Sequence, residues 1–180
     1  MSVDDDRPRA EQPAPREEPP TTDVEVEARI HYGMTGSYPL RLADLFFADD
    51  GLYISEYTFI SPFFGTLMHK DDREAKAMEA VWEKWGLDAV LVQGDYIIWH
   101  NYDNVEKVVI NMPGRWSRPK ITVYPKEGPS HAYRVHDRPQ WEEADAKMDD
   151  IAERHGFALE RESGLGIRPK ENIERFFHPK

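Results

Sequence analysis

The 180-residue sequence contains no cysteine, so it forms neither a disulfide nor a cysteine zinc site and offers no cysteine nucleophile. It has no apolar run near the roughly 18–20 residues that a helix needs to span a bilayer. Residues 1–20 also lack the apolar segment of a secretory signal. These absences predict a cytoplasmic protein without a transmembrane segment, and they leave peripheral membrane contact open.

Positive charge is scarce. Lys and Arg number 23 against 34 Asp and Glu, which gives a net charge of −11. Such a balance opposes non-specific binding along nucleic-acid phosphates, because long-range repulsion hinders approach. It would also suit a salt-rich cytoplasm, so a halophilic source is one interpretation of this composition.

Sequence motifs typical of phosphate-binding, nucleophilic or zinc sites are missing as well. Neither glycine pair, at 33–36 or at 164–166, has the frame of a phosphate-binding loop. The sequence has no nucleophile elbow and no paired-histidine zinc motif. We therefore assign no catalytic residue, no metal site and no cofactor.

The sequence divides into three parts. Residues 1–22 combine prolines with charges and hold almost no large apolar side chains, so we expect a disordered acidic tail. Residues 23–160 have the apolar patterning of one folded domain. Residues 161–180 form a C-terminal tail, in which a short amphipathic helix after Pro169 presents Ile173, Phe176 and Phe177 on one face.

Within the domain, the spacing of apolar residues changes between period two and the helical period. Alternation over 24–32 is typical of a half-buried strand, and Asp49-Asp50-Gly51 indicates a hairpin turn. Helical spacing follows Asp71 and returns before Gly156. We expect helices at 71–86 and 139–155, and strands at 24–32, 40–47, 52–58, 88–93, 95–102, 105–112, 120–125, 132–135 and 157–160. This order predicts the α+β class, with an antiparallel bent sheet, an inserted helix and a long C-terminal helix.

Two segments carry a family resemblance. Residues 45–55, Leu-Phe-Phe-Ala-Asp-Asp-Gly-Leu-Tyr-Ile-Ser, and residues 99–108, with Tyr-Asp-Asn-Val-Glu-Lys-Val at 102–108, resemble the bacterial and archaeal pleckstrin-homology-like (PH/GRAM-like) family over about residues 25–156. The resemblance implies a seven-stranded bent barrel plugged by the 139–155 helix, with the 71–86 helix as an insertion. It also implies a binding or docking module for lipids, peptides or partner domains. Residues 33–39 hold no cation, so the family's basic lipid motif is absent here.

One short stretch reverses the charge of the chain. Between residues 113 and 136 there are five cations and one acidic residue. Guanidinium groups beside an indole suit a phosphate, a carboxylate-rich peptide or a stacked base. We therefore predict a partner-binding site made of Arg115, Trp116, Arg118, Lys120 and Arg134. The alternative is a solvated loop whose cations pair with the acidic surface of this chain.

Three further hypotheses remain open. The rings around Pro62 (Tyr57, Phe59, Phe63 and Phe64) either fill the core or form a docking or dimer face. The 173–177 helix either docks into another chain or folds back on its own barrel. An enzyme using His100 with Asp95 or Asp103, such as a small-molecule hydrolase, is the main rival to a binding module. We expect a protein partner or a homo-oligomer, and nucleic-acid binding through the basic loop is a weaker alternative.

Overall fold

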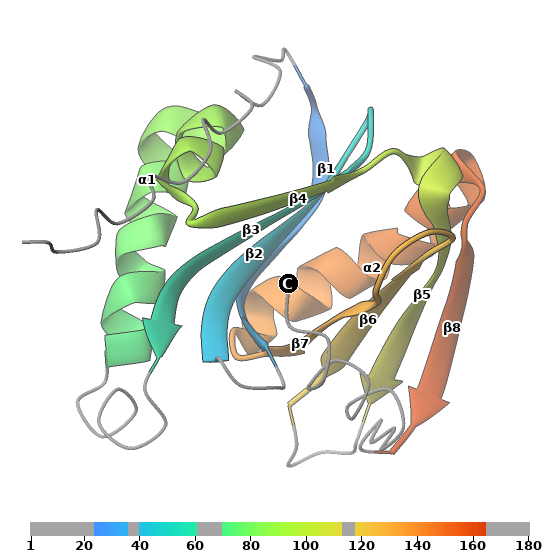
Figure 1. The fold of residues 1–180 in the computed structure, drawn as a ribbon. Coiled ribbons are helices and arrows are strands. Elements are labelled where there is room, and N and C mark those ends of the chain that lie inside the picture. The colour runs from blue at the N-terminus through green and yellow to red at the C-terminus, as the bar shows by residue number, and fades with distance from the viewer. Residues whose placement is uncertain (1–23, 36–39, 61–69, 113–117, 165–180) are drawn as a thin grey trace, which may run out of the picture.

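The fold is described from a computed structural model, which covers residues 24–35, 40–60, 70–112 and 118–164 (Figure 1). The described strands are β1 (Val26–Thr35), β2 (Leu40–Ala48), β3 (Leu52–Ile60), β4 (Tyr96–His100), β5 (Val105–Met112), β6 (Lys120–Pro125), β7 (His131–Val135) and β8 (Ala158–Ser163). The two α-helices are α1 (Lys70–Gln93) and α2 (Arg138–His155), and a short 3₁₀ turn, Tyr102–Asn104, precedes β5.

The eight strands form one bent sheet in the order β4-β3-β2-β1-β7-β6-β5-β8. Neighbours from β4 through β5 are antiparallel, as the sequence predicts, and the α+β class is confirmed. The prediction of a wholly antiparallel sheet is wrong, because β8 pairs parallel to β5. The α2 crossover carries the chain from β7, inside the sheet, to the edge beyond β5. β5 and β7 run in the same direction, and β8 enters in that direction too, so it pairs parallel to β5.

The two helices cover opposite faces of the sheet. α2 packs Trp141, Met148 and Ile151 against a core that includes Ile30, Leu45, Ile110 and Tyr133. α1 packs Met78, Val90 and Leu91 against the other face, where Phe46, Tyr53 and Tyr57 lie. Figure 1 shows α1 at the left of the sheet and α2 crossing behind β5, β6 and β7.

The inserted helix is longer than predicted. Residues 88–93, expected as a strand, continue α1 after a break at Gly86, whose φ of 75° and ψ of −161° are not helical. Leu87, Val90 and Leu91 then follow helical spacing into the core on the α1 face. The β-branched residues of this stretch favour a strand locally, and the burial of one helical face outweighs that preference.

The long second helix agrees with its prediction at both ends. Asp137 caps it by accepting a hydrogen bond from the Gln140 N–H at 3.2 Å, and Gly156 ends it in the left-handed conformation. Across the described ranges, neither helix is both long enough and apolar enough to cross a membrane.

Candidate binding surface

Three of the predicted cations gather at two neighbouring strands, two of them on the strands and one just before β6. Lys120 on β6 and Arg134 on β7 are register partners, so their side chains project from the same face of the sheet. Arg118, just before β6, is exposed and reaches His136 at the end of β7. We call Arg118, Lys120 and Arg134 the basic surface. Arg115 and Trp116, the other two predicted residues, lie outside the described residues.

His136 acts as a neutral acceptor at this surface. The Arg118 guanidinium donates to its Nδ1 at 2.6 Å. Burial, together with the nearby charges of Arg118 and Arg134, lowers the pKa of His136 to about 4. At pH 7 the ring is therefore uncharged, and it positions Arg118 without adding a positive charge of its own.

Tyr32 joins the basic surface to the first helix. Its ring packs against His136 with centroids 4.9 Å apart, and its hydroxyl donates to Asp71 of α1 at 2.9 Å. Tyr32 has a φ of 54°, within an irregularity of β1 between Ile30 and Gly33. Burial and the hydrogen bond to Asp71 raise the pKa of this phenol above its usual value, so the hydroxyl remains a donor. A non-glycine residue in this conformation marks a position that the surrounding contacts hold in place.

A buried carboxylate provides one of those contacts. Asp44 on β2 is fully buried and accepts from the Tyr32 backbone N–H at 3.2 Å and from the Tyr57 hydroxyl at 3.0 Å. Arg29 Nη2 lies 2.5 Å from one of its oxygens and His31 Nδ1 lies 2.8 Å from the other. Burial alone would raise the pKa of Asp44, but the hydrogen bonds and charges of His31 and Arg29 outweigh it and hold the pKa below the usual range.

Arg29 also ties the two helices together. Its Nη1 lies 2.5 Å from Glu79 on α1, and Glu79 accepts from Gln140 on α2 at 3.0 Å. The guanidinium carbon sits 4.9 Å from the centre of the Trp82 ring, within cation–π range. The sequence shows these residues far apart, and the one local signal was a lone aspartate inside the apolar 42–48 run.

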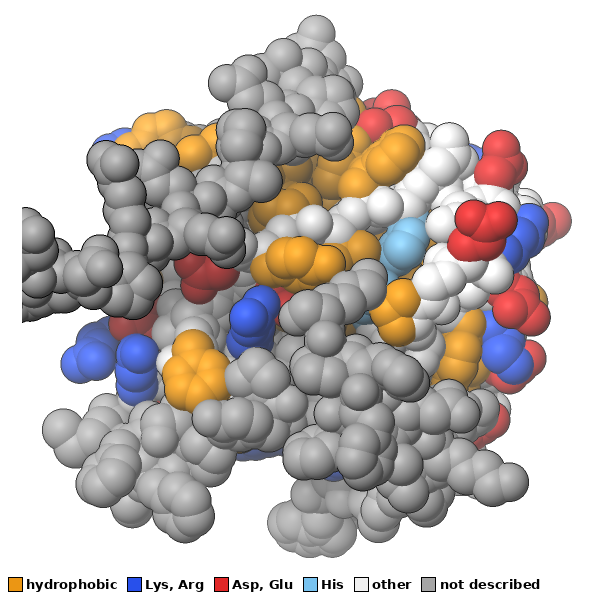
Figure 2. Space-filling model, in the orientation of Figure 1, with side chains coloured by type: hydrophobic (Ala, Val, Ile, Leu, Met, Phe, Trp, Pro, Cys, Tyr) orange, Lys and Arg blue, Asp and Glu red, His pale blue; other side chains and the backbone are white. Residues whose placement is uncertain are grey.

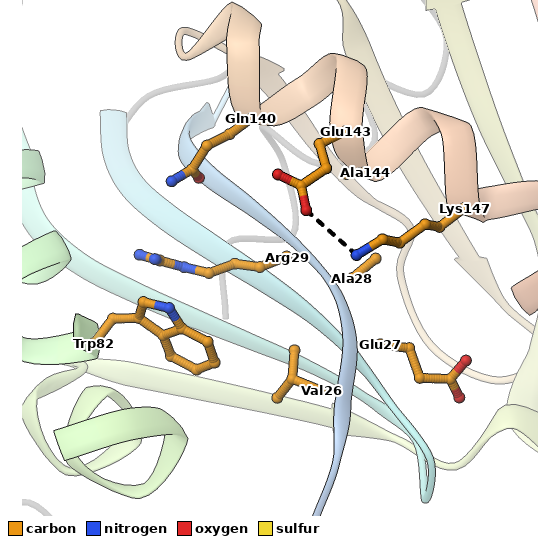
Figure 3. Close-up of a pocket in the computed structure, with 9 residues that line it drawn as sticks. All are labelled: Val26, Glu27, Ala28, Arg29, Trp82, Gln140, Glu143, Ala144 and Lys147. Carbon is orange, nitrogen blue, oxygen red and sulfur yellow. Dashed lines mark hydrogen bonds and ion pairs between the residues drawn. The ribbon is translucent and has the colours of Figure 1, made fainter. Parts of the chain in front are cut away.

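A cavity of about 230 Å³ opens beside this network, between the two helices and β1. Figure 3 shows Arg29, Trp82 and Gln140 on one side of it, and Glu143 and Lys147 joined by an ion pair on the other. Its charged lining residues are paired with one another or with neighbours. Glu27, for example, accepts from His155 and Arg154. The cavity therefore has no net charge with which to select a ligand.

The rival enzyme hypothesis depends on His100, with Asp95 or Asp103, and two other histidines lie in ring contacts nearby in the fold or on α2. His100 is buried at the end of β4, and its ring lies 5.3 Å from that of His131 on β7. Asp95 accepts from the Thr58 backbone N–H at 3.1 Å. His155 stacks on Tyr102 with ring centres 3.9 Å apart. In the ranges covered by the structure, no three His, Cys, Asp or Glu side chains gather closely enough to hold a metal ion.

The aromatic stretch around Pro62 is only partly described. Tyr57 is buried and belongs to the core on the α1 face, whereas Phe59 is 43% exposed. Phe63 and Phe64 lie outside the described residues. The predicted docking helix with Ile173, Phe176 and Phe177 lies outside them as well, so its two interpretations stay open.

Comparisons with known proteins give a distant structural likeness. No family model and no curated protein matches the sequence. Among solved structures, the chain is similar to the hSac2 domain from the human phosphoinositide phosphatase Sac2, with a TM-score of 0.44 and 12% identity. The match covers 81% of this chain and 82% of that one.

Proposed function

We propose that the chain is a non-catalytic docking module with a PH-like barrel, and that its basic surface binds an acidic segment of a partner protein. The observation that carries the proposal is that three cations lie together at the β6–β7 pair: Lys120 and Arg134 are register partners, and Arg118, just before β6, reaches His136 at the end of β7. These residues come from the stretch with the reversed charge, in a chain whose net charge is −11.

Contacts across the bent sheet support the barrel part of the proposal. β1 pairs with β2 on one side and with β7 on the other, so β1–β7 form one continuous antiparallel series. The Tyr133 hydroxyl on β7 donates to Glu56 on β3 at 2.7 Å, three strands away in the sheet order. The His100–His131 contact joins β4 to β7 in the same way. α2 packs into the core of this curved sheet, where the family resemblance expects a plugging helix.

The size and charge of the surface favour a protein segment over a nucleic acid. Three cations at neighbouring strands match a few carboxylates, and charge-assisted hydrogen bonds to arginine are among the stronger polar contacts. A long polyanion would also meet the acidic outer faces of α1 and α2, including Asp72, Glu83, Glu142 and Glu153.

Charge reversal tests this proposal. The probe is a fluorescein-labelled peptide of alternating Glu and Ser, with its binding to the full chain followed by fluorescence anisotropy. We expect Arg118→Glu/Arg134→Glu to weaken binding by at least about tenfold, because two charge-assisted contacts become repulsive. Lys76→Glu/Lys147→Glu is the matched control. It changes the net charge equally at exposed helical positions and should alter binding by less than about threefold.

Equal effects of the two double variants would contradict the proposal, since they would show a response to net charge alone. A labelled single-stranded DNA of equal charge forms the second arm. Tighter binding of the DNA than of the peptide, lost in the same variant, would overturn the protein partner in favour of a nucleic acid.

A further inference from the structure

We infer that the outer edge of β4 is a second docking site, which accepts an extended peptide segment with an apolar β-branched centre and basic ends. β4 is the terminal strand of the sheet and pairs only with β3 among the described residues. Its register with β3 runs from Tyr96 to His100 without a bulge. Along Tyr96–Trp99 the edge therefore presents a regular row of backbone donors and acceptors.

The side chains of β4 leave this edge open. Strand edges are normally protected by lysine, proline, a bulge or a covering element, because an unprotected edge pairs with other chains. β4 reads Tyr-Ile-Ile-Trp-His and contains none of the protecting residues. Tyr96 is 39% exposed and Trp99 is 49% exposed. Figure 2 shows hydrophobic side chains gathered where β4 crosses this face of the molecule.

The two exposed rings would contact an added strand from both sides. Trp99 is the register partner of Tyr53, whose ring faces α1, and Tyr96 is the partner of Glu56, which points into the barrel. A bound strand would thus meet one aromatic ring on each face. Pairs of aromatic and β-branched side chains are favourable across neighbouring strands, so Val, Ile or Thr suits the centre of the occupant.

The charge at the ends of β4 indicates which residues the bound peptide carries on either side of its apolar centre. Exposed Asp95 directly precedes the strand, and exposed Asp103 follows it. The Asp49-Asp50 turn lies at the second end, because Gly51 directly abuts the His100 backbone and the Trp99 indole. Lys126, whose N–H bonds to the Asn104 carbonyl, offsets part of this charge. Basic residues on both sides of an apolar centre complement the arrangement.

The same charges oppose a second copy of this chain as the occupant. In an antiparallel β4–β4 pair centred on Ile98, Asp95 of one copy faces position 101 of the other and lies diagonally beside Asp103. Like charges would then meet at both ends of the pair, in molecules that each carry −11. A cationic peptide has no such cost.

The test uses three labelled nonapeptides and the full chain. The first has five alternating valines and threonines between two lysines at each end. The second replaces the lysines by glutamates, and the third keeps the lysines but carries N-methyl groups on alternate central residues. We expect saturable binding of the first peptide, binding of the second weaker by at least about tenfold, and loss of binding for the third, which cannot complete the backbone ladder.

Variants locate the site. Tyr96→Lys/Trp99→Lys adds positive charge to the edge and should weaken binding of the lysine peptide by at least about tenfold. Trp85→Lys/Met112→Lys removes equally exposed apolar side chains away from β4 and should change binding by less than about threefold. The inference would be overturned if Tyr96→Lys/Trp99→Lys bound the lysine peptide as tightly as the unaltered chain does. It would also be overturned if the unaltered chain did not bind the lysine peptide.

Two further outcomes would also overturn it. A concentration-dependent dimer that the β4 variant abolishes would identify a second copy as the occupant. If the outer backbone amides of β4 already exchange slowly in the free chain, a segment of the chain itself is the occupant of this edge. Under the inference, those amides exchange rapidly when free and slow at least about tenfold on addition of the lysine peptide.

Discussion

At the scale of single residues, Asp44 is the centre of a buried polar network. Asp44 has no solvent exposure, and four groups compensate its charge or fill its acceptor sites: Arg29, His31, Tyr57 and the Tyr32 N–H. Removing one member of a buried pair leaves the other charged and poorly solvated, which costs more than the pair itself contributes. Arg29 is the group that this effect destabilises most, since it lies between Asp44 and Glu79.

Replacing Asp44 by asparagine tests this network directly. Asp44→Asn keeps the shape of the side chain and removes its charge, so we expect the unfolding free energy to fall by about 3–5 kcal/mol. Urea denaturation followed by tryptophan fluorescence measures the change. Asp72→Asn, at an exposed carboxylate paired with Lys76, is the control and should cost no more than about 0.5 kcal/mol. A loss below about 1 kcal/mol in Asp44→Asn would contradict the network.

His136 predicts the direction of a pH effect. Its pKa in the folded chain is about 4, whereas an unfolded histidine has a value near 6.5. Between these values the unfolded chain binds a proton that the folded chain does not, so stability falls as the pH is lowered through this range. His136→Phe keeps a ring beside Tyr32 and should lose less stability between pH 7 and pH 4.5. Urea denaturation at several pH values gives the unfolding free energy of both proteins. If it falls with pH equally in His136→Phe and in the unaltered chain, His136 does not have the low pKa.

At the scale of elements, α1 depends on a break in its own helix. Gly86 has a positive φ combined with an extended ψ, a region that is nearly restricted to glycine. Apart from the adjacent backbone, no heavy atom lies within 4 Å of the place where a Cβ would stand, so a substitution there meets backbone strain rather than a clash with packed side chains. The break lets Leu87, Val90 and Leu91 reach the core from the second half of the helix.

Gly86→Ala should therefore reduce the unfolding free energy by about 1–3 kcal/mol. Glu83→Ala, at an exposed position one turn earlier in the same helix, should change it by less than about 0.5 kcal/mol. Thermal and urea unfolding of both variants give the comparison. If Gly86→Ala were as stable as the unaltered chain, or more stable, the second half of α1 would not need this conformation.

Most elements could be predicted from the sequence, because their apolar periods agree with where they pack. The 3.6-residue period of α2 matches its burial, whereas the alternation in β1 matches burial only through Ile30 and ends at His31, which is buried in the Asp44 network. Residues 88–93 were predicted wrongly, since local preference there conflicts with the face that is buried. The parallel pairing of β8 with β5 depends on the return path of α2, which no local pattern encodes.

The candidate site was predictable only where it is local in sequence. Arg118, Lys120 and Arg134 stand out because one short stretch reverses the charge of the chain. The Asp44 network was missed, because Arg29, Tyr57 and Glu79 come from three separate elements and meet only after folding. The β4 edge was missed for a similar reason, as being last in a sheet is a property of topology.

At the scale of the whole molecule, charge is distributed unevenly. Residues 1–27 hold nine acidic residues against three arginines, and residues 138–162 hold eight against four basic residues. Between them in the sequence lies the positive stretch that includes the basic surface. The β4 edge has carboxylates at its ends and selects the opposite charge from its occupant.

The two proposed sites should therefore act independently. Arg118→Glu/Arg134→Glu, which weakens the acidic peptide, should leave binding of the lysine-flanked peptide within about twofold of the unaltered chain. Tyr96→Lys/Trp99→Lys should do the opposite: it should weaken binding of the lysine-flanked peptide and leave binding of the acidic peptide nearly unchanged. Cross-titration by anisotropy measures this, and a single variant that removes both activities would indicate one shared surface or a loss of the fold.

Chemical-shift mapping shows whether the acidic partner binds at the basic surface. The ¹⁵N-labelled full chain is titrated with the unlabelled Glu-Ser peptide at fixed pH and salt. We expect shift changes concentrated at residues 118–122 and 131–136, with little change in α1 or β4. Changes centred elsewhere, or none at peptide concentrations that saturate the anisotropy signal, would contradict it.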